Sequence, residues 1–132
     1  MRIPVFGSIY HVSQGLHSNR ETLMNTFIPH LKMGHYHGKG IKFSKKGDFF
    51  KAITYFERAL ENAKKCGNPA MIPFELEAIA HSYFMLEEYK KAEKFTIESL
   101  KMYNELLNEG TIIKDSIERV NSMLTLIREK GV

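Results

Sequence analysis

The clearest hydrophobic pattern lies between residues 45 and 64, in KKGDFFKAITYFERALENAK. Its apolar and small residues recur every three or four positions, which predicts one buried face of a helix: Phe49, Ala52, Ile53, Phe56, Ala59, Leu60 and Ala63. KKGD before it is a turn signal, and Tyr36, Gly40 and Phe43 stand at helical spacing upstream. We therefore predict a helical hairpin over about 33–66.

A second hairpin is expected at about 73–107, after the break CGNPAMIP. Two further sets of apolar and small residues mark its helices: Leu76, Ile79, Ala80 and Tyr83, then Tyr89, Ala92, Thr96, Ser99, Leu100, Tyr103 and Leu107. A last helix at 111–130 has a seam that must be buried: Ile113, Ile117, Val120, Leu124 and Ile127.

The first thirty residues differ from the rest of the chain. Residues 1–17 alternate loosely and suggest a strand-like arm or a flexible tail. Ser18 and Glu21 fit a helix N-terminal capping box, and we expect Pro29 to end the short helix that follows. We thus predict an all-α protein with an N-terminal arm at 1–30 and one helical domain at 31–130.

Composition is that of an ordinary soluble domain: 132 residues, 43% hydrophobic, 26% charged and a formal net charge of +4. Cys66 is the single cysteine, so no intrachain disulfide can form. No apolar run is long enough for a signal peptide or a membrane span. We expect a cytoplasmic protein without membrane contact.

The reactive side chains do not form a recognisable catalytic or metal-binding pattern. His35 and His37 are two residues apart and would point in nearly opposite directions on a helix, whereas paired metal ligands need a spacing of three or four. Cys66 has no histidine or acid placed beside it by the sequence. We predict no enzymatic activity, no metal and no cofactor.

Lysines gather around both hairpin turns: Lys39, Lys42, Lys45, Lys46 and Lys51, then Lys90, Lys91 and Lys94. Lysines grouped in this way usually form a solvent-exposed surface, so we do not expect nucleic acid as a partner.

The two hairpins align with each other at an offset of forty residues. KGDFFKAITYFERALE stands over LEEYKKAEKFTIESLK, which pairs Ala52 with Ala92 and Phe56 with Thr96, and upstream Gly40 pairs with Ala80. This order of small and aromatic positions resembles the tetratricopeptide repeat, in which small residues let two helices approach and large ones fill the gaps. The resemblance implies a short α-solenoid of two hairpins with a C-terminal capping helix.

The long period resembles, more specifically, the helical repeats of bacterial peptide-pheromone receptors, including the Rap phosphatase regulators. The segment FELEAIAHSYFMLEEYKKAEKFTIESLKMY is similar to theirs. Residues 1–30 are too few for the effector module of those receptors, so this resemblance implies a short regulatory relative or a fragment.

In tetratricopeptide hairpins the first helices line a concave groove. The resemblance places nine residues of this chain there: His37, Ile41, Ser44, Lys45, Phe74, Glu77, His81, Phe84 and Met85. Such a surface suits a peptide or protein segment. Alternatively, the last helix covers the groove by packing its seam on Phe84 and Met85. The Lys, Asn and Arg clamp of chaperone-tail adaptors is absent.

We therefore predict a non-enzymatic scaffold that binds a peptide or protein segment in its groove. Because two hairpins are few for a stable solenoid, homodimerisation or exchange of an element between chains is also expected. The alternatives are the short regulatory relative of the pheromone receptors and an assembly protein whose own oligomer fills the groove.

Overall fold

The computed structural model describes the backbone of residues 12–132 and the side chains of residues 27–108 and 110–132. This part of the chain is entirely helical, which confirms the predicted all-α class. Its elements are α1 Val12–Lys45, α2 Phe49–Lys65, α3 Met71–Met85, α4 Tyr89–Glu105, the short 3-10 helix η1 Leu107–Glu109, and α5 Thr111–Lys130. None of the helices described is both long and apolar enough to cross a bilayer.

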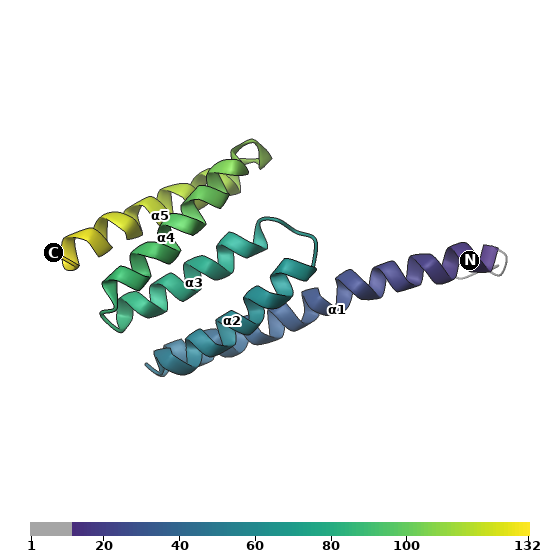
Figure 1. Ribbon diagram of the computed structural model, residues 1–132, viewed down its shortest axis with the longest axis horizontal. Coiled ribbons are helices and arrows are strands. Elements are labelled where there is room, and N and C mark those ends of the chain that lie inside the picture. Colours follow the sequence, from purple (N-terminus) through teal and green to yellow (C-terminus); the bar gives the residue numbers. More distant parts are fainter. Residues whose placement is uncertain (1–11) are drawn as a thin grey trace.

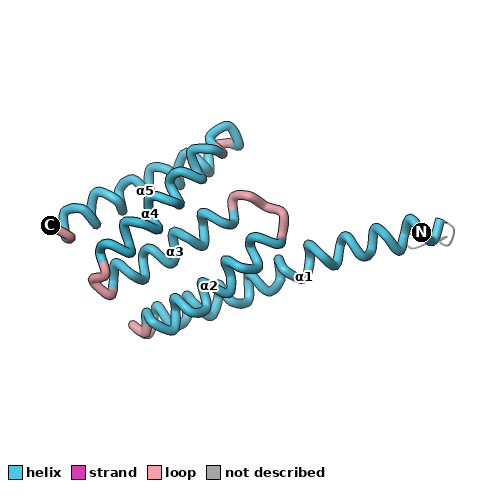
Figure 2. The backbone as a smooth tube through the Cα atoms, in the orientation of Figure 1, coloured by secondary structure: helices cyan, strands magenta, loops and turns pink. Residues whose placement is uncertain are grey.

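Each helix packs mainly against the next one along the chain (Figure 1). The pairs α1 with α2 and α3 with α4 are antiparallel and joined by short turns, whereas a longer loop joins α2 to α3 (Figure 2). The N-terminal half of α1 extends beyond α2 on the side away from the C-terminus (Figure 1). The ranges predicted for the second hairpin and the last helix correspond to α3–α4 and α5, whereas the first helix of the first hairpin, predicted from about residue 33, is the C-terminal part of the longer α1.

The expectation that Pro29 ends a helix is wrong, because Pro29 lies inside α1. A proline in a helix loses one N–H donor and crowds the carbonyl four residues earlier, at a cost of about 3 kcal/mol, but it does not force the chain to turn. Residues 12–17, expected to be an arm or a tail, form the start of α1. The same expectation for residues 1–11 lies outside the described residues.

A close contact at Gly40 joins α1 to α2. Gly40 is buried, and a Cβ atom built on it would lie only 2.5 Å from the ring of Phe56. Phe56 itself is 2% exposed and belongs to a core cluster with Ala52 and Ile79. The small residue on α1 therefore leaves room for the large one on α2, as the sequence pattern predicted.

The two hairpin turns share the same backbone geometry forty residues apart. Gly47 (φ 80°) and Glu87 (φ 61°) occupy the same left-handed position. The same backbone hydrogen bond, 2.9 Å long, closes each turn: Asp48 N–H to Phe43 O and Glu88 N–H to Tyr83 O. The second turn thus places a glutamate in a conformation that favours glycine.

An aromatic pair also repeats at this offset. Phe43 stacks on Tyr55 with ring centroids 5.4 Å apart, and Tyr83 stacks on Phe95 at 5.6 Å. The internal alignment of the sequence is therefore matched by turn geometry and by side-chain packing.

The apolar seam of α5 is buried against α4. Val120 and Ile113 cluster with Tyr103, and Leu100 and Ile117 pack around them. The expectation that this seam covers Phe84 and Met85 is therefore wrong: the seam faces α4, and Met85 remains 47% exposed.

We expect Gly40→Ala to lower the free energy of unfolding by about 1–3 kcal/mol, because the added methyl group overlaps the buried Phe56 ring. Gly38→Ala is the matched control, since Gly38 is exposed on the same helix and has open space around its Cβ position. That variant should gain about 0.5–1 kcal/mol from helix propensity. Urea denaturation measures both, and equal effects of the two variants would contradict the packing argument.

We expect Glu87→Gly to raise the free energy of unfolding by about 1 kcal/mol, because glycine removes the strain of a left-handed residue. Gly47→Ala introduces that strain into the first turn and should lower stability by a similar amount. Thermal denaturation of the two variants tests whether the turns are equivalent. Changes of the same sign would show that they are not.

Candidate functional site

The candidate site is an open groove with a volume of about 640 Å³. Eight of the nine predicted groove residues line it, namely His37, Ile41, Ser44, Lys45, Phe74, Glu77, His81 and Met85. The ninth, Phe84, does not, and its ring packs edge-on against Tyr89 at the start of α4 instead. The structure thus brings together residues from two hairpins that are up to 48 positions apart in the sequence.

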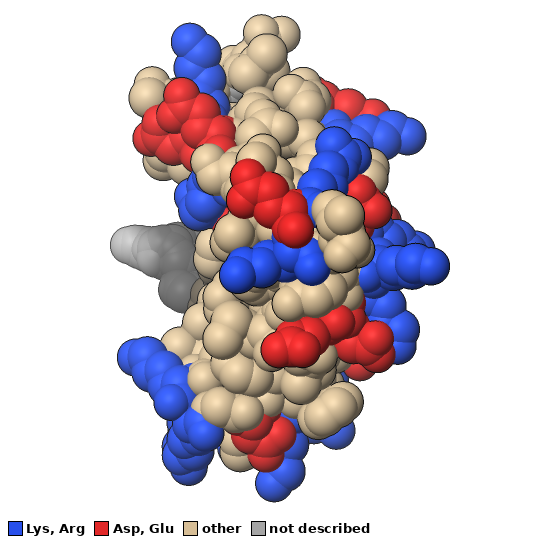
Figure 3. Space-filling model, turned by 90° about the vertical axis from the view of Figure 1, so that its left-hand side faces the viewer, with Lys and Arg blue, Asp and Glu red and all other residues tan. Residues whose placement is uncertain are grey.

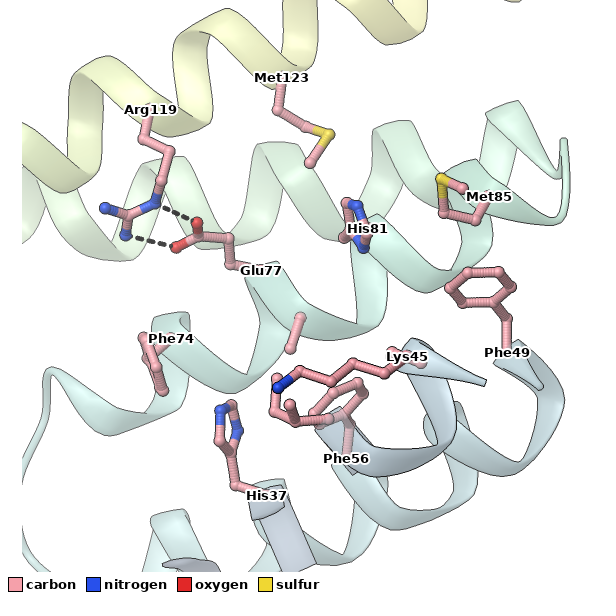
Figure 4. Close-up of a pocket in the computed structure, with 13 residues that line it drawn as sticks. His37, Lys45, Phe49, Phe56, Phe74, Glu77, His81, Met85, Arg119 and Met123 are labelled. Carbon is pink, nitrogen blue, oxygen red and sulfur yellow. Dashed lines mark hydrogen bonds and ion pairs between the residues drawn. The ribbon is translucent and has the colours of Figure 1, made fainter. Parts of the chain in front are cut away.

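Four helices form the groove (Figure 4). The C-terminal end of α1 supplies one wall, α3 runs along the middle, and α5 supplies the opposite wall. From α2, Phe49 and Phe56 complete the apolar lining. Three large apolar side chains are partly open to solvent there: Ile41 and Phe74 are each 37% exposed and Met85 is 47% exposed.

The sequence did not predict the contribution of α5, which is Arg119 and Met123. The forty-residue period would instead place Ile117 and Asn121 at the positions of Glu77 and His81. Ile117 packs in the core between α4 and α5 instead. The side of α5 that lines the groove is therefore not the side that the repeat predicts from α3. The rotation of α5 follows its own apolar seam, which is buried against α4.

Glu77 and Arg119 form a two-point ion pair that connects α3 to α5 (Figure 4). Arg119 Nη2 donates to Glu77 Oε1 at 2.9 Å, and Arg119 Nε donates to Oε2. The Tyr103 hydroxyl of α4 donates to the same Oε1 at 3.2 Å. The charge of Glu77 is therefore compensated within the chain, and this predicted groove residue is already engaged.

Tyr103 remains a hydrogen-bond donor over the whole physiological pH range. Burial, followed by the negative charge of Glu77, raises the pKa of Tyr103 to about 12. The hydroxyl proton therefore stays available to the Glu77 carboxylate.

A second polar contact crosses between helices at His37. His37 Nδ1 is hydrogen-bonded to Glu75 Oε1 at 2.9 Å, and its ring lies between those of Phe74 and Phe56, with centroids 4.9 and 5.3 Å away. Glu75 is 0% exposed, and its Oε2 has no hydrogen-bond partner among the described residues. A histidine that lines the groove is thus hydrogen-bonded to a buried carboxylate.

The surroundings of Glu75 favour its uncharged form. Burial raises the pKa of Glu75 above its ordinary value of 4.5, while the hydrogen bond and the charge of His37 oppose the rise in part. Net desolvation prevails because a single hydrogen bond cannot replace the water that a carboxylate loses on burial.

Charge is unevenly divided along the chain. Residues 30–66 contain nine Lys and Arg against three Asp and Glu, whereas residues 67–132 contain eight against eleven. On the face that carries the hairpin turns, basic side chains lie at the lower left and along the right edge (Figure 3). The groove therefore has a basic first hairpin on its α1 side and an ion-paired wall on its α5 side.

The other reactive side chains do not gather around the groove in a metal-binding cluster. Across the described part of the chain, no group of three or more His, Cys, Asp and Glu side chains is placed to hold a metal ion. Cys66 lies outside the groove, where its thiol donates to the Ala63 carbonyl.

None of the protein-family models, curated proteins or solved structures compared with this chain matches it. Conclusions about its function therefore depend on the geometry of the groove and on the resemblance in the repeat.

We expect Glu75→Gln to change how stability depends on pH. Since folding raises the pKa of Glu75, its contribution to stability is complete below pH 4.5 and is lost as pH rises through the folded-state pKa. The wild type should therefore lose stability relative to Glu75→Gln as pH rises above 4.5, by on the order of 1–3 kcal/mol. Urea denaturation at several pH values measures this, and parallel curves would contradict it.

Proposed function

We propose that this protein is a non-enzymatic scaffold that binds a peptide or protein segment in the groove between α1, α3 and α5. The observation that carries the proposal is that eight residues selected from a repeat pattern line one open, largely apolar groove. Grooves with a few polar groups among apolar anchors are typical of peptide-binding surfaces.

We also propose that the chain is a short tetratricopeptide-like array capped by α5. The shared turn geometry and the repeated aromatic pair, both at an offset of forty residues, support this. Packing of each helix on the next is what such an array requires.

The length of the groove suits a short extended segment. Phe74 and Met85 lie at opposite ends of the α3 lining and are eleven residues apart, which is about 16 Å along a helix. An extended chain covers this distance in about five residues. We therefore propose a linear segment, and no reaction is proposed for the site.

A second candidate function is self-assembly. Phe27 and Leu31 are 55% and 53% exposed, on successive turns of α1. Two large apolar side chains presented in this way favour contact with another copy of the chain. In this alternative a second copy fills the groove or covers α1.

The groove proposal predicts that Ile41→Ser combined with Met85→Ser abolishes capture of a partner from native lysate. Both side chains line the groove and are partly exposed, so the changes remove apolar contact without opening the core. Phe50→Ser is the matched control, because Phe50 is 73% exposed on α2 and does not line the groove. Mass spectrometry then compares the proteins captured by the wild type, by the double variant and by Phe50→Ser.

The proposal holds if a protein is captured by the wild type and by Phe50→Ser but is lost with the double variant. Capture that is unchanged in the double variant contradicts a groove-binding scaffold. Light scattering on the same samples distinguishes self-assembly, which would appear as a change in mass. Circular dichroism confirms that each variant remains helical.

A further inference from the structure

His37 and Glu75 form a buried dyad whose chemistry the proposed function does not use. The carboxylate of Glu75 is inaccessible to solvent and contacts Nδ1 of His37, while the imidazole itself lines the groove. One oxygen of the carboxylate has no partner among the described residues. A charged carboxylate in such a position is costly unless a proton compensates it.

The proton count of the dyad decides what His37 presents to a ligand. With one proton, the carboxylate is charged, Nδ1–H donates to it, Nε2 is a bare acceptor, and the pair has a net charge of −1. With a second proton the pair is neutral, either as carboxylate with imidazolium or as carboxylic acid with imidazole. Nε2 carries a hydrogen in the first form, and also in the second when the acid proton on Oε1 is donated to Nδ1.

Burial of Glu75 favours the neutral forms, because they avoid an uncompensated charge in the core. The ring nitrogen that is not used by Glu75 is then an N–H donor. No side chain in the described part of the chain is hydrogen-bonded to this Nε2.

Lys45 provides a cation on the same wall of the groove. It is the last residue of α1, and its side chain runs back along the groove toward His37 (Figure 4). No carboxylate of the described residues forms an ion pair with it. On the opposite wall the charge of Arg119 is already matched by Glu77.

We infer that the segment bound in the groove carries an acidic side chain, which His37 and Lys45 bind while apolar neighbours of that side chain contact Ile41, Phe74 and Met85. This inference rests on the proposed function and adds the chemistry of the ligand. The basic first hairpin, with nine basic residues against three acidic ones, supplies the complementary charge. Glu75 acts as a positioning residue, since it sets the protonation and orientation of His37 without touching the ligand.

Glu75→Gln is the decisive variant. The side-chain amide has nearly the same shape; its oxygen can accept from Nδ1–H without a charge to be neutralised, or its NH2 group can donate to Nδ1, and nitrogen NMR of the ring distinguishes the two. Where the amide oxygen accepts from Nδ1–H of a neutral imidazole, Nε2 has no hydrogen, so the groove loses its donor while the contact between the helices is kept. Lys45→Met is a second variant at an exposed position and removes the cation independently.

The dyad can be tested without any ligand. Nitrogen NMR of the histidine rings at pH 7 should show a hydrogen on Nε2 of His37 in the wild type and none in Glu75→Gln. The other groups that face the groove are Lys45 of α1, Glu77 and His81 of α3, and Arg119 of α5; the lining contribution of α2 is not titratable. A bare Nε2 in the wild type overturns the inference.

The ligand chemistry is tested by selecting a library of random dodecapeptides on the immobilised wild type at pH 7. We expect the selected peptides to be enriched in Asp or Glu next to large apolar residues. Selection on Glu75→Gln and on Lys45→Met should recover apolar peptides without that enrichment. The best peptide should bind the wild type at least about tenfold more tightly than Glu75→Gln, and a version with its acid changed to the amide should lose most of this difference.

The outcomes separate this inference from the proposed function. Apolar peptides that lack acidic residues, but depend on Ile41 and Met85, overturn the inference and leave the groove proposal standing. If no selected peptide depends on Ile41 and Met85 for binding, the groove proposal and the inference are both overturned. A second copy of the chain as occupant, seen as a dimer that Ile41→Ser dissociates, also overturns the inference.

Discussion

The close contact between α1 and α2 at Gly40 is the constraint on which the groove depends. Because Gly40 has no side chain, the ring of Phe56 fits beneath α1 and also reaches the lining of the groove. Phe56 in turn packs with Ile79 of α3, so the same ring connects the first hairpin to the second. The relative position of the two helices that supply most of the groove is thus fixed by one small residue and one large one.

Two polar contacts then join the helices that line the groove, and they differ in kind. Glu77 and Arg119 are partly exposed and joined by two hydrogen bonds, so they hold α5 beside α3. His37 and Glu75 join α1 to α3 through a carboxylate that has no access to solvent. The pair Glu77–Arg119 joins two groups of opposite charge. In the pair His37–Glu75, the net charge and the hydrogen-bond donors change with the number of bound protons.

Much of this arrangement could be predicted from the sequence, because helical periodicity and turn residues are local signals. The hairpins and the last helix were predicted from apolar spacing and an internal repeat, and the groove-facing side of α3 from the resemblance to the tetratricopeptide repeat. The continuation of α1 through Pro29 was not, since a propensity rule cannot say whether the helix runs on. Neither Arg119 in the groove nor the burial of Glu75 could be predicted, because both depend on how one helix is rotated against another.

The packing of each helix on its neighbour in the chain has a further consequence for how the protein folds. Contacts between residues close in sequence can form without first closing a long loop, so such a topology has a low contact order and folds rapidly. In the described chain α5 packs mainly on α4 and has no extensive contact with α1 or α2, so local opening can start at α5 with little disturbance of the first hairpin. Apart from its contacts with α4, this wall of the groove is held by the pair Glu77–Arg119, so loss of that pair would let the groove widen at α5 while the α1 wall stays in place.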